Sequence, residues 1–182
     1  MAHLGIPFTV KPSPIDEGDL NLSGAPARQA MDSAAAKASA AAGVDRDKWV
    51  LAADTIVCID GMILGKPGSR DEARRMLALL SGRCHIVVTG VCLSYYGKEN
   101  PPPIYEETKV WMMPLSERQI EGYLDTGESM DKAGAYGIQH FGGSMIPRVE
   151  GCYFNVMGLP LYRTARLLEE AGFVLMREGA DE

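Results

Sequence analysis

An aspartate and a threonine stand next to each other in one of the most apolar parts of the sequence. Asp54 and Thr55 follow two alanines within the run 49–59, which is rich in β-branched residues. A charged side chain is seldom fully buried unless it is paired or functional. Asp54 is therefore a candidate functional residue. An acid that ends a strand and caps a turn would produce the same pattern.

Five further polar residues are weaker candidates. Lys37 lies in an Ala-rich stretch, Lys66 in a Gly-Lys-Pro turn, and Gln139 after a run of small residues. Asp16 and Glu17 follow a proline-rich turn. Each has an ordinary structural explanation: a solvated helix face, a turn cation, a capping amide or an acidic loop. Taken singly, none of these residues predicts a function.

Common functional motifs do not occur in the sequence. The run 61–67 resembles a P-loop, but its glycines are one residue too close, and Pro67 replaces the Ser or Thr that would hold Mg²⁺. The three histidines are isolated, and the four cysteines form no C-x-x-C pair. The sequence therefore predicts no zinc site and no catalytic triad.

Helix signals mark the elements that must position the candidate residues. An Ala-rich helix is predicted over 25–42, with Ser23 as its cap and Gly43 as its stop. A serine followed three residues later by Glu or Gln predicts two more helix starts, at Ser69 and Ser116. A last helix is predicted over 161–171, where apolar residues recur on one face.

Strand signals alternate with these helices and include a hairpin. The runs 84–95 and 104–113 are separated by a proline-rich segment, which predicts two strands joined by a long loop. Further strands are predicted at 6–10, 49–59 and 145–149. The alternation favours an α/β or α+β domain with a mixed sheet.

Length and charge limit the function classes. The chain has 182 residues, of which 46% are apolar, so we expect one domain spanning 1–182. A net charge of −6 argues against binding to nucleic-acid polymers, which requires many cations. This charge does not exclude binding of a single nucleotide. We expect no membrane span, no signal peptide and a reduced cytosolic setting.

The weak candidates gain weight together, because they fall into ordered motifs that resemble the Maf family over most of the chain, from about residue 4 to residue 173. The upstream motifs are Ile-Asp-Glu (15–17), Ala-Lys-Ala (36–38), Ala-Asp-Thr (53–55) and Gly-Lys-Pro (65–67). The later ones are Leu-Ser-Gly-Arg-Cys-His (80–85), Val-Thr-Gly-Val (88–91), Gly-Glu (127–128), Asp-Lys-Ala-Gly-Ala-Tyr-Gly-Ile-Gln (131–139) and Asn-Val-Met-Gly-Leu-Pro-Leu (155–161).

The resemblance implies a cytoplasmic, often dimeric nucleoside triphosphate pyrophosphatase that yields a monophosphate and pyrophosphate. It implies an elongated mixed sheet with flanking helices and a central cleft, similar to the inosine triphosphatase group. The Asp-Thr pair and the Tyr-Gly-Ile-Gln run resemble the branch that acts on dTTP and UTP.

The same resemblance assigns roles to the candidate residues. Asp54 would be the proton acceptor, and Glu17 with Asp54 would hold Mg²⁺ or Mn²⁺ through carboxylate oxygens. Lys37 and Lys66 would neutralise the triphosphate. Thr55 and Gln139 would help to select the base, since an amide offers both a donor and an acceptor.

The chain departs from the family at its start. Members begin with a strand and a loop resembling Ser-x-Ser-Pro-Arg-Arg, and residues 4–10 match the stretch after the helix that follows that loop. We therefore expect a chain truncated at its N-terminus. Two alternatives stay open: a nucleotide-binding regulatory protein linked to septum formation with little catalysis, and an enzyme for modified nucleotides.

Overall fold

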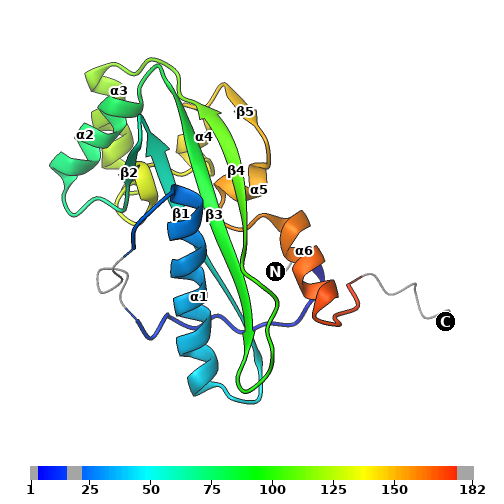
Figure 1. Cartoon of the computed structure of the whole chain (residues 1–182). Helices are drawn as coiled ribbons and strands as arrows, with labels where there is room; N and C mark the ends of the chain where they lie inside the picture. The colour runs from blue at the N-terminus through cyan, green and yellow to red at the C-terminus, as the bar shows by residue number, and fades with distance from the viewer. Residues whose placement is uncertain (1–3, 16–21, 176–182) are drawn as a thin grey trace.

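A five-stranded antiparallel sheet forms the centre of the computed structural model, which describes residues 4–15 and 22–175 (Figure 1). The strands follow the order β2-β1-β3-β4-β5. They are β1 (Trp49–Ile59), β2 (Met62–Leu64), β3 (Cys84–Tyr95), β4 (Ile104–Trp111) and β5 (Arg148–Glu150). The α/β class is confirmed. The sheet is not mixed, because every described strand pair is antiparallel.

The helices flank this sheet. They are α1 (Pro26–Val44), α2 (Arg70–Leu80), α3 (Glu117–Asp125), the 3₁₀ turn η3 (Ala133–Ala135), α4 (His140–Gly143), α5 (Tyr153–Val156) and α6 (Leu161–Glu170). In Figure 1, α1 runs along the long strands, and α2 and α3 lie together at one end of the sheet. Within the described residues, no helix is both long and apolar enough to cross a membrane.

The two faces of β3 pack against different helices, because successive side chains of a strand point to opposite sides. Cys92 packs with Ala34 and Ala38 of α1. Its neighbours Val91 and Leu93 pack with Leu167 and Leu168 of α6. The sheet is therefore covered on both faces, as the continuous apolar run of β3 requires.

Helix α1 lies unusually close to the sheet. Gly90 of β3 meets its backbone directly: a Cβ atom built on Gly90 would be 2.3 Å from the carbonyl carbon and oxygen of Ala30. Ala30, Ala34 and Ala38 are all 0% exposed. The alanines of α1 thus act as small contact residues, which the helix propensity of Ala alone does not indicate.

The predicted elements are largely confirmed, and the differences lie at their ends. Strand 49–59 and both Ser-capped helices agree with the predictions, with Ser69 and Ser116 accepting hydrogen bonds from main-chain N–H groups. Ser23 is not the cap of α1, because the helix starts with Pro26 after Ala25. Gly43 does not stop the helix but lies within it.

Two predicted strands differ from the structure. Residues 6–10 form no strand, although they were expected to. Pro7 lacks a main-chain donor, which weakens any ladder at that point. The late strand lies at 148–150 rather than 145–149, where it pairs with β4. All four cysteines are free thiols; Cys84 is exposed, although its apolar run favours burial.

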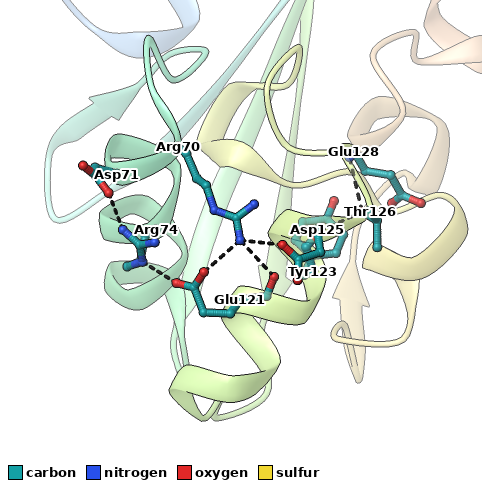
Figure 2. Close-up of polar contacts among 8 residues, drawn as sticks. All are labelled: Arg70, Asp71, Arg74, Glu121, Tyr123, Asp125, Thr126 and Glu128. Atoms are coloured by element: carbon teal, nitrogen blue, oxygen red, sulfur yellow. Dashed lines mark hydrogen bonds and ion pairs between the residues drawn. The ribbon is translucent and has the colours of Figure 1, made fainter.

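An ion-pair cluster ties α2 to α3 (Figure 2). Arg70 contacts Glu121 at 2.8 Å and Asp125 at 2.7 Å, and Arg74 bridges Asp71 and Glu121. The hydrogen bonds from Arg74 and Arg70 lower the pKa of Glu121 to about 2. Tyr123 of α3 lies next to this cluster.

Replacing Gly90 tests the close contact between α1 and β3. We expect Gly90→Ala to lower the free energy of unfolding by about 3 kcal/mol or more, because the new Cβ cannot avoid the backbone of Ala30. The control is Gly43→Ala in α1. A Cβ at this position meets nothing within 4 Å, so the variant should stabilise the protein by up to about 1 kcal/mol. Urea unfolding followed by circular dichroism measures both. Equal effects of the two variants would contradict the role of Gly90.

Candidate active site

A cleft of about 300 Å³ lies against the part of β1 that β2 leaves unpaired. It is bounded by α1, by the loop around Lys66, by residues 131–139 and by the turn after α5. Five of the six predicted site residues line it: Lys37, Asp54, Thr55, Lys66 and Gln139. The sixth, Glu17, lies outside the described residues. The volume is at the lower end of the range of small-molecule sites.

A close ion pair occupies one side of the cleft. Lys37 Nζ is 2.5 Å from Asp54 Oδ1, and the two side chains are only 10% and 12% exposed. Asp54 lies opposite Gly90 in the β1–β3 ladder, so the glycine that admits α1 also sets the distance between α1 and this carboxylate. A nearly buried contact of this kind fixes the orientation of the carboxylate.

The side chain of Thr55 lies on the opposite face of β1 from that of Asp54, because adjacent side chains of a strand point to opposite faces. Its hydroxyl oxygen is 2.9 Å from that of Thr89 on β3. Thr89 in turn donates a 3.0 Å hydrogen bond to the main-chain carbonyl of Asn155 on α5. The strand therefore presents an acid toward α1 and a hydroxyl toward α5 within one cleft.

A pair of charged residues and a glycine are among the lining residues of the cleft that received no role in the sequence prediction. Asp131 and Lys132 lie in the wall and form an ion pair at 2.7 Å. This hydrogen bond from Lys132 lowers the pKa of Asp131, and the charge of Lys66 contributes as well. Gly158 lines the cleft beside Thr55. The sequence signal for Asp131 and Lys132 was their position as adjacent charged residues directly before the small-residue run 133–138.

Gln139 lies at the exposed mouth of the cleft, on a segment held from behind. The Tyr123 hydroxyl accepts a 3.1 Å hydrogen bond from the main-chain N–H of Gly137. Figure 2 shows that Tyr123 comes from the helix that carries the ion-pair cluster. The buried Tyr136 hydroxyl lies 2.6 Å from His85 Nε2. These contacts fix the position of a segment that has little regular structure.

The donor chemistry of the cleft fits a divalent cation in part. Asp54 and Asp131 provide carboxylate oxygens, and Mg²⁺ is commonly bound by one or two carboxylates together with substrate phosphates. The described residues contain no group of three His, Cys, Asp or Glu side chains that could hold a metal ion by themselves. The described carboxylates are therefore suited to a cation that arrives with a phosphate ligand.

His85 gives the protein a pH-dependent stability. Burial lowers the pKa of His85 to about 4, below the ordinary value near 6.5 of the unfolded chain. The unfolded state therefore takes up a proton first as the pH falls. The stability is fully present above the unfolded pKa and is lost as the pH falls through the folded pKa. We expect a loss of about 2 kcal/mol between about pH 7.5 and about pH 5.

Urea unfolding at both pH values measures this loss. The variant His85→Gln keeps a neutral partner for Tyr136 but cannot titrate, so its stability should change far less over the same interval. An identical pH dependence in the variant would assign the effect to other groups.

The comparisons with known proteins agree on one family. The family model described as Maf-like protein matches residues 1–171. A protein of Symbiobacterium thermophilum named dTTP/UTP pyrophosphatase is 44% identical over 99% of this chain and 91% of its own length. One of Moorella thermoacetica with the same name is 46% identical over 92% of this chain and 86% of its own. One of Caldanaerobacter subterraneus, also so named, is 44% identical over 93% and 81%. The chain belongs to the Maf-like protein family.

Proposed function

We propose that this protein is a nucleoside triphosphate pyrophosphatase that hydrolyses dTTP and UTP to the monophosphate and pyrophosphate. The observation that carries the proposal is the Lys37–Asp54 pair in a cleft that also contains Lys66, Thr55 and Gln139. Relatives 41–46% identical to this chain are named dTTP/UTP pyrophosphatase. The family resemblance assigns the same residues to this reaction.

The cations of the cleft would offset part of the charge of a triphosphate. A triphosphate carries several negative charges, and the whole chain has a net charge of −6. Lys37, Lys66 and Lys132 place three ammonium groups around the cleft, where they would offset the charge locally. Pyrophosphate is a good leaving group once its developing charge is stabilised in this way.

Asp54 is the proposed proton acceptor. Attack of water on the α phosphorus requires a base that takes up the proton of that water. The ammonium of Lys37 holds one oxygen of the carboxylate, which orients the group toward the cleft. A bound Mg²⁺ or Mn²⁺, held by Asp54, Asp131 and the predicted ligand Glu17, would supply Lewis-acid stabilisation of phosphate charge.

The same family resemblance supports three coarser proposals: a single domain over 1–182, a cytoplasmic location and a homodimer. Size-exclusion chromatography with light scattering tests the last. The alternative of a regulatory nucleotide-binding protein receives no support from the names of the relatives. An enzyme for modified nucleotides uses the same site and differs in its substrate.

A nucleotide panel tests the activity. We expect release of pyrophosphate, and not of single phosphate, from dTTP and UTP in the presence of Mg²⁺ or Mn²⁺. Modified pyrimidine triphosphates belong in the same panel, and their preferential hydrolysis would support an enzyme for modified nucleotides. Binding of nucleotides without any release of pyrophosphate would support a regulatory nucleotide-binding protein.

Asp54→Asn tests the proposed base. We expect it to lower kcat by about 10²–10⁴-fold with little change in fold, because the amide cannot accept the proton. Asp60→Asn is the matched control. Asp60 follows the same strand directly but pairs with Arg83 outside the cleft, so its variant should keep normal turnover. Near-normal activity of Asp54→Asn in a pyrophosphate assay would exclude Asp54 as the base.

A further inference from the structure

Two walls of the cleft are joined by a main-chain hydrogen bond. The N–H of Gly134 donates to the carbonyl oxygen of Gly65 at 3.0 Å. Gly65 stands between β2 and Lys66, whereas Gly134 belongs to η3, far along the chain. The bond therefore ties the loop that carries Lys66 to the wall that carries Lys132.

The backbone around Gly134 forms a tight turn that suits glycine. The N–H of Ala135 donates to the carbonyl oxygen of Lys132 at 3.0 Å and closes the turn 132–135, in which Gly134 is the third residue. The φ of Gly134 is 69°, in the left-handed region that glycine adopts without steric cost. A type II turn requires a positive φ at the same position.

Strand β1 leaves little room for a side chain on this turn. A Cβ built on Gly134 would lie 3.1 Å from Cγ1 of Val57 and 3.2 Å from its Cβ and Cγ2. Val57 is 3% exposed, and Leu64 is its partner in the β1–β2 ladder. Because Leu64 directly precedes Gly65, the contact with Val57 brings the turn against the residue whose carbonyl it binds.

The same turn determines where the side chain of Lys132 lies. Lys132 opens the turn and its stem crosses Gly137, since a Cβ built on Gly137 would be 2.7 Å from Cδ and Cε of Lys132. The ammonium of Lys132 pairs with Asp131 at 2.7 Å. This hydrogen bond lowers the pKa of Asp131, and the charge of Lys66 lowers it too. Both ammonium groups therefore lie near one carboxylate.

Holding two lysines close together has a cost that the turn reduces for a ligand. Ammonium groups repel each other at short range, and ordering a long lysine side chain costs conformational entropy. A backbone that fixes the attachment points of both lysines in advance lowers the entropy lost on binding. The ligand that two neighbouring ammonium groups fit is a diphosphate, because it carries negative charge on two linked phosphates.

We propose that Gly134 is a positioning residue: its turn joins two walls of the cleft and sets the spacing of Lys66 and Lys132, which together hold the pyrophosphate portion of the triphosphate. The inference rests on the proposed function and deepens it, because it names the residue that prepares the cleft for the leaving group. Gly134 is buried and does not line the cleft, so it acts through the two lysines.

Gly134→Ala, with Gly61→Ala as its matched control, tests the proposal. The two glycines have φ values of 69° and 78°, so both variants carry the same kind of backbone strain. Only the new Cβ at Gly134 presses on a neighbour, because a Cβ at Gly61 has nothing within 4 Å. Gly61 lies in the turn between β1 and β2, outside the cleft. Calorimetry with pyrophosphate and with UMP, both in the presence of Mg²⁺, measures the two ends of the cleft separately.

The two ligands separate a positioning role from a general loss of structure. We expect Gly134→Ala to bind pyrophosphate at least about tenfold more weakly than wild type, and UMP within about twofold of wild type. Gly61→Ala should bind both ligands as wild type does. Unchanged pyrophosphate binding by a folded Gly134→Ala variant, or an equal loss of affinity for the two ligands, would overturn the proposal.

Hydrogen exchange in the unaltered protein, followed by NMR, depends neither on a variant nor on turnover. The bond to Gly65 predicts slow exchange of the Gly134 N–H, and pyrophosphate should slow it by at least about a further tenfold, because the ligand holds both walls. Rapid exchange that pyrophosphate leaves unchanged would overturn the proposal.

The outcomes also distinguish this inference from the proposed function. Slow exchange and tight binding of pyrophosphate, without hydrolysis of dTTP or UTP, would support the positioning role and reject the proposed activity. Hydrolysis of UTP with the same kcat/KM in wild type and in Gly134→Ala would reject the positioning role and keep the activity.

Discussion

The direct contact of α1 with the sheet is the constraint on which the cleft depends. Gly90 meets the backbone of Ala30 with no room for a side chain, and buried alanines continue the contact along the helix. A larger residue at this point would lift α1 away from β1. Lys37 is carried by that helix and Asp54 by the rung opposite Gly90, so their 2.5 Å contact requires the two elements to be this close. Glycine and alanine are used here for the distance between elements rather than for flexibility or helix propensity.

The alternation of side chains along β1 divides the cleft into two chemically different sides. Asp54 faces α1 and the ammonium group of Lys37. Thr55 belongs to a buried set of neutral hydrogen bonds that reaches α5. Two neighbouring residues have different surroundings within one cleft because a strand directs them to opposite faces. The edge that β2 leaves open makes both accessible from one cleft.

Support for the exposed wall comes from elements outside the cleft. Residues 131–139 have little regular structure, yet Tyr123 from α3 and His85 from β3 hold this segment through hydrogen bonds to Gly137 and Tyr136. The ion pairs of Figure 2 join α3 to α2. They therefore connect the helix that carries Tyr123 to a neighbouring helix. A shift in α3 would therefore reach the segment that carries Gln139.

Much of the fold and most of the candidate site follow from the sequence. Strand 49–59, the two Ser-capped helices and the hairpin have local causes, namely apolar runs, caps and turn residues, and local causes can be recognised without a structure. Three predictions were wrong: the helix ends at Ser23 and Gly43, and the strand at 6–10. A cap or a strand needs a partner, and that partner can lie elsewhere in the chain. By itself the sequence determined the residue types available for chemistry and the elements that carry them. Only the tertiary structure decided which of them meet and that Asp131, Lys132 and Gly158 join them, because these depend on contacts between segments far apart in the chain.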